Sequence, residues 1–418
     1  MIQHHPQWNR NQAGGNRSIA SALNQGDKMN YKLAPKLAAV IFYGLIISAN
    51  WTGAVGEVPQ GKTQLHATTN WRIEPSFKFD LLCFLNTLTG DSFYVEYYPN
   101  EYREFKPLLT PAAQAALADL KRKIKDENQG IISASLCLYF SATDDQTLDD
   151  MLKTLKNSDR MQSNLKQTPY YSEEDWRLFE GVREDLKTIL LFLKNIQFES
   201  YWARNVLPRV SQKIRQIEKD LPGYNVIKEV EIMLGFALPS NRITVFMLYY
   251  SQPHGIKVTG TRFLTDVAWP FQIVLRNAVH EMMHPPYDLA HDPELKKTLY
   301  LLKQDQFLTD KIENHNPAFG YNSFEGYLEE DCVQALEQII DEKLKIEKEA
   351  HLRWKESDDG MHVFAVALYR VMKDENYNQK GELFRDFLVR MIASGRLSPG
   401  NIKKIYDDFY LNSEKQPR

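Results

Sequence analysis

Apolar residues recur along most of this chain with the period of an α-helix, and this feature limits the fold more than any other. From about 57 to 236 the pattern is mainly helical. Thr110 followed by Pro111 has the N-cap and N1 order of a helix start, and Ser172 with Asp175 resembles a capping box. The helix expected after Ser172 has an apolar stripe made of Trp176, Phe179, Leu186, Ile189, Leu190 and Leu193. We expect this stripe to be helical core.

One segment breaks the helical period. Residues 242–250 (RITVFMLYY) are rich in β-branched and aromatic side chains, and prolines and glycines follow, which predicts a strand and then a loop. Helical patterns return at 269–284, 294–309 and 325–350, a loop is expected at 314–322, and two or three more helices are expected between 361 and 410. The expected fold class is therefore α+β, predominantly α.

The N-terminus has the order of a secretory signal peptide. Lys28, Lys32 and Lys36 precede the apolar run 37–48 (LAAVIFYGLIIS), and small residues follow it. The run is shorter than the roughly 20 residues of a membrane span. We therefore expect a signal peptide around 29–56, starting at Met29 and cleaved near Ala49 or Gly56, and an exported, periplasmic or extracellular protein. The alternative is an uncleaved membrane anchor.

Composition excludes some classes of protein. A chain of 418 residues with 43% apolar and 25% charged residues is globular and long enough for two or three domains. Its net charge of -3 comes from mixed charges without a basic stripe, so nucleic acid is not an expected partner. The three cysteines, Cys83, Cys137 and Cys332, allow at most one internal disulfide and have no zinc-binding CxxC spacing.

Residues 280–284 (HEMMH) carry the strongest chemical signal. His280 and His284 are four residues apart, so on a helix their rings can reach one cation. Glu281 lies about 100° around the helix from His280 and can take a proton from a water that Zn²⁺ activates. Pro285 and Pro286 follow, which ends the helix beyond the motif. The alternative is two histidines on a helix surface.

A catalytic zinc usually has three protein ligands. A short extension of the motif would need a histidine at position 290, which is Ala290, and His291 comes one residue late. A carboxylate on a later helix is the other source, and residues 327–336 (YLEEDCVQAL) provide Glu329 and Glu330.

Together the two segments resemble the gluzincin class of zinc metallopeptidases, in which HExxH is completed by a glutamate on a later helix. The resemblance covers about 242–340 and implies a zincin-like core: an edge strand, an HExxH helix and a glutamate-ligand helix. The strand at 243–250 is expected to be that edge strand, against which a peptide substrate could pair. The segments HEMMHPPYD and YLEEDCVQAL also resemble exported bacterial domain families of unknown function.

Two arguments disagree about the third ligand. The apolar positions around the ligand of thermolysin-like proteins match Glu330, with Leu328, Cys332, Ala335 and Leu336 in the expected places. Simple amphipathic phase instead places Glu329 near the apolar stripe. We expect Glu330 to bind the metal because both faces of such a helix can be covered, with Glu329 as the alternative.

The resemblance also implies supporting residues. The aspartate that orients a histidine in this class, four residues after the ligand, is Gln334 here, so Asp288 and Asp331 are candidates for that role. A tyrosine or histidine that stabilises the oxyanion is expected among His315, Tyr321 and Tyr287, which lie in loops near the two motifs.

The sequence thus predicts a zinc metallopeptidase that acts on a peptide or protein substrate and has no membrane span after signal cleavage. The expected organisation is a leader and signal peptide (1–56), a helical N-terminal domain (57–236), a zincin-like catalytic domain (237–350) and a C-terminal helical region (351–418). Two alternatives are an exported helical binding or scaffold protein with a non-catalytic zincin-like core, and a zinc hydrolase of a non-peptide substrate. The oligomeric state is not determined by these patterns.

Overall fold

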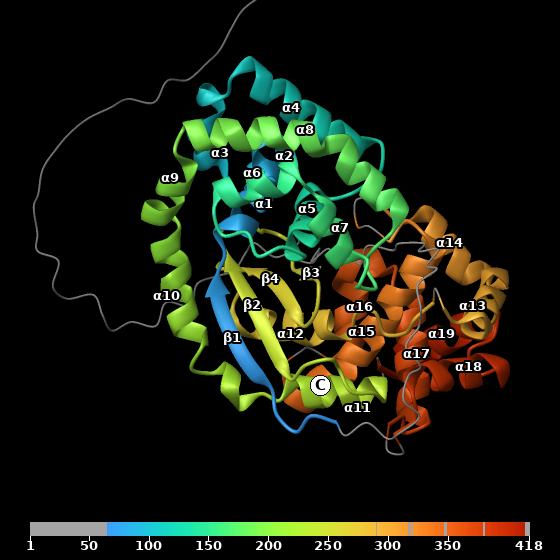
Figure 1. Ribbon diagram of the computed structural model, residues 1–418. Helices are drawn as coiled ribbons and strands as arrows, with labels where there is room; N and C mark the ends of the chain where they lie inside the picture. Colours follow the sequence, from blue (N-terminus) through green and yellow to red (C-terminus); the bar gives the residue numbers. More distant parts are fainter. Residues whose placement is uncertain are drawn as a thin grey trace, which may run out of the picture. The chain divides into compact units, whose positions relative to one another are not determined.

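The computed structural model describes residues 65–289, 291–316, 319, 321–346, 349–378 and 381–413, which belong to one compact unit. Helices predominate in these residues and accompany one small sheet (Figure 1), which confirms the expected α+β, predominantly α class. The expected leader and signal peptide, 1–56, lie outside the described residues. None of the described helices is both long and apolar enough to cross a lipid bilayer.

The sheet has four strands in the order β1-β2-β4-β3. They are β1 (Asn70–Pro75), β2 (Arg242–Leu248), β3 (Ile256–Val258) and β4 (Arg262–Asp266). β2 pairs in parallel with β1 and with β4, whereas β3 pairs antiparallel with β4. β1 lies in the segment expected as the N-terminal domain and β2 in the segment expected as the catalytic domain, so the two segments share one sheet.

The strand expectations need two corrections. The predicted strand at 242–250 exists as β2, but it is internal and not the edge strand, because β1 and β4 cover both of its sides. Its apolar run suits a buried parallel strand, which has neighbours on every side. The edge next to β4 is β3, a short strand in the segment that was expected to be a loop. β1 was also missed, inside a region that otherwise follows a helical pattern.

Helices of the first half of the chain are connected to the sheet mainly through α1, α5 and α10, which contact β2, β3 and β1 respectively. Thr110 and Ser172 cap α4 and α8 as expected, since their hydroxyls accept the amides of Ala113 and Asp175. The bounds are α1 Phe77–Leu88, α2 Ser92–Val95, α3 Pro99–Phe105, α4 Pro111–Lys121, α5 Ile132–Ser141, α6 Leu148–Lys156, α7 Asp159–Leu165, α8 Glu173–Asn195, α9 Phe198–Asn205, α10 Leu207–Ile217 and α11 Val226–Leu234.

Helices of the second half follow the sheet. The bounds are α12 Phe271–Met283, α13 Pro293–Tyr300, α14 Gln306–Asn314, α15 Phe324–Leu344, α16 Ala350–Glu356, α17 Val363–Asp374, α18 Phe384–Ala393 and α19 Asn401–Ser413. The helix expected at 294–309 is interrupted, because the Asp305 side chain caps a new helix by accepting the amide of Leu308. The long helix expected at 325–350 ends earlier, at Leu344, because the backbone of the next residue, Lys345, is left-handed.

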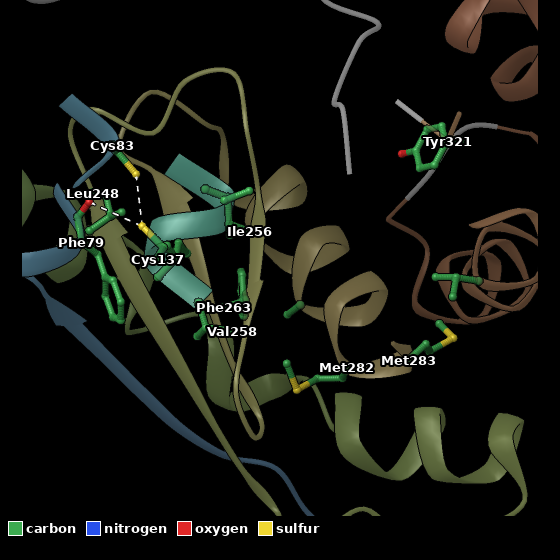
Figure 2. Packing of buried hydrophobic residues seen from close by; sticks show 14 of the residues in the cluster. Phe79, Cys83, Cys137, Leu248, Ile256, Val258, Phe263, Met282, Met283 and Tyr321 are labelled. Atoms are coloured by element: carbon green, nitrogen blue, oxygen red, sulfur yellow. Dashed lines mark hydrogen bonds between the residues drawn. The ribbon is translucent and has the colours of Figure 1, made fainter. Parts of the chain in front are cut away.

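A continuous core joins these elements. Figure 2 shows Ile256 and Val258 of β3 and Phe263 of β4 among the buried apolar side chains, with Met282 and Met283 of α12 in the same cluster. Both α11 and α15 contact α12. The helix that contains the HExxH motif is therefore fixed by the sheet and by two other helices.

Gly235 ends α11 in a left-handed conformation, with φ of 81°, and its amide donates to Glu231. A Cβ atom there would lie 2.5 Å from the carbonyl oxygen of Glu382. We expect Gly235→Ala to lower the free energy of unfolding by at least about 2 kcal/mol, because it adds both strain and a backbone clash. Urea unfolding of the two proteins measures this.

The matched control is Gly181→Ala in α8, where an added Cβ meets no atom within 4 Å. This change should raise the free energy of unfolding by about 0.5 to 1 kcal/mol, since alanine favours a helix over glycine. Equal stability of the Gly235 variant and the wild type would contradict the packing of α11 described above.

Candidate metal centre

The helix α12 positions His280 and Glu281, and its end positions His284. His280 and Glu281 are almost completely buried, with exposed fractions of 0% and 2%. His284 directly follows the last residue of α12, and its own backbone is extended. A residue that precedes a proline, as His284 does, favours this conformation. Its ring still turns back to that of His280, and the two Nε2 atoms are 3.0 Å apart.

The helix α15 positions the carboxylates. It is buried on more than one face, since Leu328, Glu330, Asp331 and Cys332 are all at most 1% exposed. The side chain of Glu329 is 21% exposed. The expectation that both faces of this helix can be covered is therefore confirmed. It explains why amphipathic phase alone did not point to the buried carboxylate, Glu330.

His280, His284 and Glu330 converge on one point. Among the described residues these three form the group whose donor atoms lie close enough together to hold a metal ion. Glu330 Oε2 is 3.6 Å from Nε2 of His280 and 3.6 Å from Nε2 of His284. Ligand atoms about 2.0 to 2.2 Å from a tetrahedral zinc are about 3.3 Å apart, so the three separations fit such an ion.

Glu330 Oε2 gives a second indication. It is a buried carboxylate oxygen that accepts no hydrogen bond from the part of the chain that the structure describes. Leaving such an oxygen buried without a partner costs free energy. A cation between this oxygen and the two imidazoles would remove that cost, so the residues present fit a metal ion with nitrogen and oxygen ligands.

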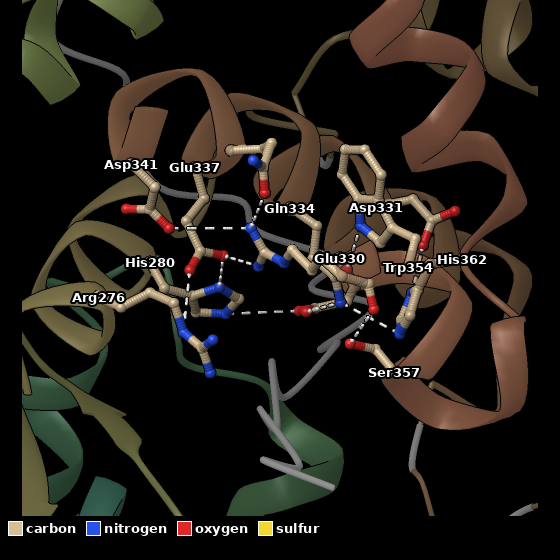
Figure 3. A network of polar contacts seen from close by, with 12 residues as sticks. Arg276, His280, Glu330, Asp331, Gln334, Glu337, Asp341, Trp354, Ser357 and His362 are labelled. Carbon is tan, nitrogen blue, oxygen red and sulfur yellow. Dashed lines mark hydrogen bonds and ion pairs between the residues drawn. The ribbon is translucent and has the colours of Figure 1, made fainter. Parts of the chain in front are cut away.

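Each candidate ligand is also held from its far side. Nδ1 of His280 is 3.1 Å from Glu337 Oε2 (Figure 3). Nδ1 of His284 is 3.2 Å from Glu329 Oε1. The other oxygen of Glu330 accepts Nε2 of Gln334 at 2.9 Å. Glu329, the alternative third ligand, thus lies on the outer side of His284. Partners of this kind fix the tautomer and orientation of metal-binding histidines.

The residues expected to orient the histidines have other partners. Asp331 is 2.6 Å from Nδ1 of His362, and Asp288 is 2.8 Å from Nδ1 of His291. The expectation for Asp331 and Asp288 was wrong because a carboxylate near the motif in sequence need not face it. Glu337 was missed, although it follows Glu330 by two helical turns and so lies on the same side of α15.

Burial and charge alter the acidity of this centre. Burial raises the pKa of Glu281, which His280 and His284 oppose. Burial would also raise the pKa of Glu337, but Arg353 and His280 outweigh it and lower that pKa to about 2. Glu337 is therefore an anion near neutral pH, whereas Glu281 holds a proton more readily than an exposed glutamate, as a proton carrier requires.

Gly255, directly before the edge strand β3, lies beside Glu281. A Cβ atom on Gly255 would be 3.4 Å from Glu281 Oε1 and 3.1 Å from Asn277 Nδ2, so the backbone approaches the base closely there. Lys257 on β3 interacts with the charge of Glu281, and burial lowers the pKa of Lys257 to about 8. The edge strand and the candidate base are therefore neighbours.

Two buried aspartates hold the loop that leads to this edge. Asp80 Oδ1 accepts the amides of Tyr249 and Tyr250, both at 2.8 Å. Asp266 Oδ2 accepts the amides of Ser251 and Gln252, both at 3.1 Å. Neither aspartate was expected, because no motif in the sequence marks it and the contacts of Asp80 span about 170 residues.

The three residues expected to stabilise an oxyanion lie in different surroundings. The ring of His315, at the end of α14, is bonded to the carbonyl of Ile312 in that helix at 2.6 Å. The ring of Tyr321 packs against His362 with centroids 5.8 Å apart. The hydroxyl of Tyr287 lies beside Cys332, and burial raises its pKa. Their catalytic roles remain predictions.

Tyr170, in the connection between α7 and α8, was not expected at all. Its hydroxyl donates to the carbonyl oxygen of His284 at 3.3 Å. Burial raises the pKa of Tyr170, and so do the charges of Glu329 and Glu281. This hydroxyl therefore lies beside the candidate metal centre, although Tyr170 precedes the HExxH motif by more than 100 residues.

No family model, curated protein or solved structure matches this chain.

Zinc binding at this centre should strengthen as the pH rises. Burial disfavours protonation of His284, but Glu329 and Glu330 outweigh it and raise the pKa of His284 to about 10. Below that pH the imidazole carries a proton that a metal ion must displace. One displaced proton corresponds to about tenfold tighter binding per pH unit. Titration calorimetry in buffers of different ionisation enthalpy measures the protons released.

Glu329→Gln provides the control for this pH dependence. It removes one of the two carboxylates that hold the proton on His284, so fewer protons should be released per zinc ion bound. Zinc affinity that is independent of pH in the wild type would contradict the assignment of His284.

Proposed function

We propose that this chain is a zinc metallopeptidase with a zincin-like core, in which His280, His284 and Glu330 bind Zn²⁺. The observation that carries the proposal is the buried Glu330 oxygen facing two imidazole nitrogens at equal distance. Two histidines and one glutamate are a common ligand set of hydrolytic zinc sites, and they leave the fourth position of the ion open. A Ca²⁺ or Mg²⁺ site would instead be built from oxygen ligands.

The residues around the ion have separate roles in this proposal. Zinc supplies Lewis acidity, which lowers the pKa of water towards neutrality. Glu281 accepts a proton from the water while the water oxygen bonds to the carbonyl carbon of the scissile amide. Glu281 then donates that proton to the leaving nitrogen, so the C–N bond breaks and the carboxylate is restored. The raised pKa of Glu281 suits both transfers.

The edge strand β3 supports a peptide as the substrate. No described strand pairs with the side of β3 that faces away from β4, so a peptide in extended conformation could add to the sheet there. Gly255, directly before this strand, approaches Glu281 closely, which would place a peptide on β3 next to the base. In this proposal β3, and not the strand at 243–250, is the strand that pairs with the peptide substrate.

Tyr170 is our proposal for the residue that donates to the oxygen of the reacting carbonyl. Its contact with the His284 carbonyl is long for a bond from a hydroxyl, so the hydroxyl can turn to a substrate oxygen. A donor aimed at the developing negative charge stabilises the transition state more than the substrate.

Glu281→Gln tests the role of the base. The variant should keep its bound zinc, because Glu281 is not a ligand, and should lose activity by at least about 100-fold, because the amide cannot carry the proton. Zinc content by mass spectrometry and hydrolysis of a quenched-fluorescence peptide library are the measurements. His280→Ala should instead lose the metal.

A matched control is Glu229→Gln, another buried glutamate, whose partner is Lys343 on α15. It should keep both zinc and activity. Full activity of Glu281→Gln would refute its role as the base.

Tyr170→Phe tests the oxyanion donor. We expect kcat to fall by about 100-fold with KM and zinc content unchanged, since the hydroxyl acts on the transition state. Tyr171→Phe is the control, because the neighbouring hydroxyl bonds Gln162 and Glu173 and has no contact with the centre. Equal kcat in both variants would exclude Tyr170 from the reaction.

One observation favours the alternative of a binding protein with a non-catalytic core. Glu281 and the three candidate ligands are at most 9% exposed, so a substrate must displace something to reach them. Stoichiometric zinc together with no hydrolysis of the peptide library would support that alternative.

A further inference from the structure

The helix α16 (Ala350–Glu356) carries two adjacent residues that reach the candidate metal centre indirectly. Arg353 and Trp354 are buried, with exposed fractions of 7% and 1%. Figure 3 shows Trp354 beside the chain of polar contacts that ends at His280 and Glu330. The sequence had given this C-terminal region no role.

Arg353 is linked to His280 through Glu337. Its Nη2 atom is 2.6 Å from Glu337 Oε2, the same oxygen that lies 3.1 Å from Nδ1 of His280. Its Nη1 atom donates to Gln338 Oε1 at 3.1 Å. A planar guanidinium that binds two acceptors has a fixed orientation. Arg353 therefore holds the Glu337 carboxylate in the orientation that faces His280.

Trp354 is linked to Glu330 through Gln334. Its indole nitrogen donates to Gln334 Oε1 at 3.0 Å. Because an indole N–H can only donate, it must face the oxygen of the Gln334 amide. The amide nitrogen of Gln334 then faces Glu330 Oε1, to which it donates at 2.9 Å. This leaves the other oxygen, Oε2, for the metal position.

We propose that α16 is a clamp for the metal centre, in which Arg353 and Trp354 are positioning residues for His280 and Glu330. The inference rests on the proposed zinc site. Two neighbouring side chains of one helix orient ligands on two different helices, so the docking of α16 and the binding of zinc favour each other. Such coupling is reciprocal: zinc stabilises the docked helix by the same factor by which the docked helix raises zinc affinity.

Zinc affinity of the full-length chain tests the clamp. Arg353→Met removes the guanidinium, and Trp354→Phe removes the indole donor while it keeps an aromatic ring. Loss of an outer partner of a metal ligand weakens binding by about 10- to 100-fold, and we expect this range for both variants. The dissociation constant is measured by competition for Zn²⁺ with a chromogenic chelator.

Two matched controls remove similar contacts elsewhere. Arg385→Met breaks a two-bond contact with Asp292 that joins α18 to the start of α13. Trp71→Phe removes an indole donor from the carbonyl of Tyr224. Both should leave zinc affinity unchanged. If Arg353→Met does not fold, Arg353→Lys keeps the charge but cannot bind Glu337 and Gln338 together, and it should also weaken zinc binding.

Zinc-dependent hydrogen exchange distinguishes coupling between α16 and the metal centre from a purely structural role of Arg353 and Trp354. Saturating Zn²⁺ should slow amide exchange in 350–356 of the wild type and of Trp71→Phe, and should slow it less in Trp354→Phe. Equal zinc affinity in all variants, or unchanged exchange in α16, would overturn the clamp and leave the zinc site intact. A wild type that binds no zinc would overturn both proposals.

Discussion

The structure depends on how a buried carboxylate and two buried imidazoles are kept away from water. Removing Glu330, His280 and His284 from solvent costs free energy unless each polar atom finds a partner. The inner atoms face one another across the candidate metal position, where a cation would complete their contacts, and the partners of the outer atoms come from further side chains. The need to satisfy these groups links the centre through α15 to α16 and to the start of α17.

The outer partners extend this arrangement in two directions. Towards α16, Glu337 and Gln334 connect the centre to an arginine and a tryptophan. Towards α17, Asp331 and Asp358 hold His362 on both of its nitrogens, at 2.6 and 2.9 Å. Burial disfavours the charged imidazole, but the two aspartates raise the pKa of His362 to about 10. A buried charge is therefore paired at each step, which is the condition under which such charges persist.

The surroundings of Glu281, the candidate base, are fixed by other contacts. The loop after β2 turns towards Gly255 because Asp80 and Asp266 accept its successive amides. Asp80 lies on α1 and Asp266 at the end of β4, so the backbone next to Glu281 is fixed by elements from both halves of the chain. The N-terminal half also supplies β1 and Tyr170. The N-terminal half therefore forms part of the sheet and also places a side chain beside the candidate metal centre.

The sequence by itself determined what depends on short spacing. Periodicity predicted the helical class, α12 and most of α15, and side-chain capping predicted the starts of α4 and α8. The four-residue spacing of His280 and His284 determined that they can share one ion, because a helical turn brings such residues together. The apolar positions around Glu330 favoured this residue as the third ligand and amphipathic phase favoured Glu329. Tertiary structure decided between them, since both faces of α15 are buried and Glu330 faces the two imidazoles. It also decided that β3, and not β2, is the edge strand beside the centre. The residues that surround the centre, Glu337, Tyr170, Arg353 and Trp354, were likewise decided by tertiary structure. Contacts between segments far apart in the sequence have no period that a sequence can reveal.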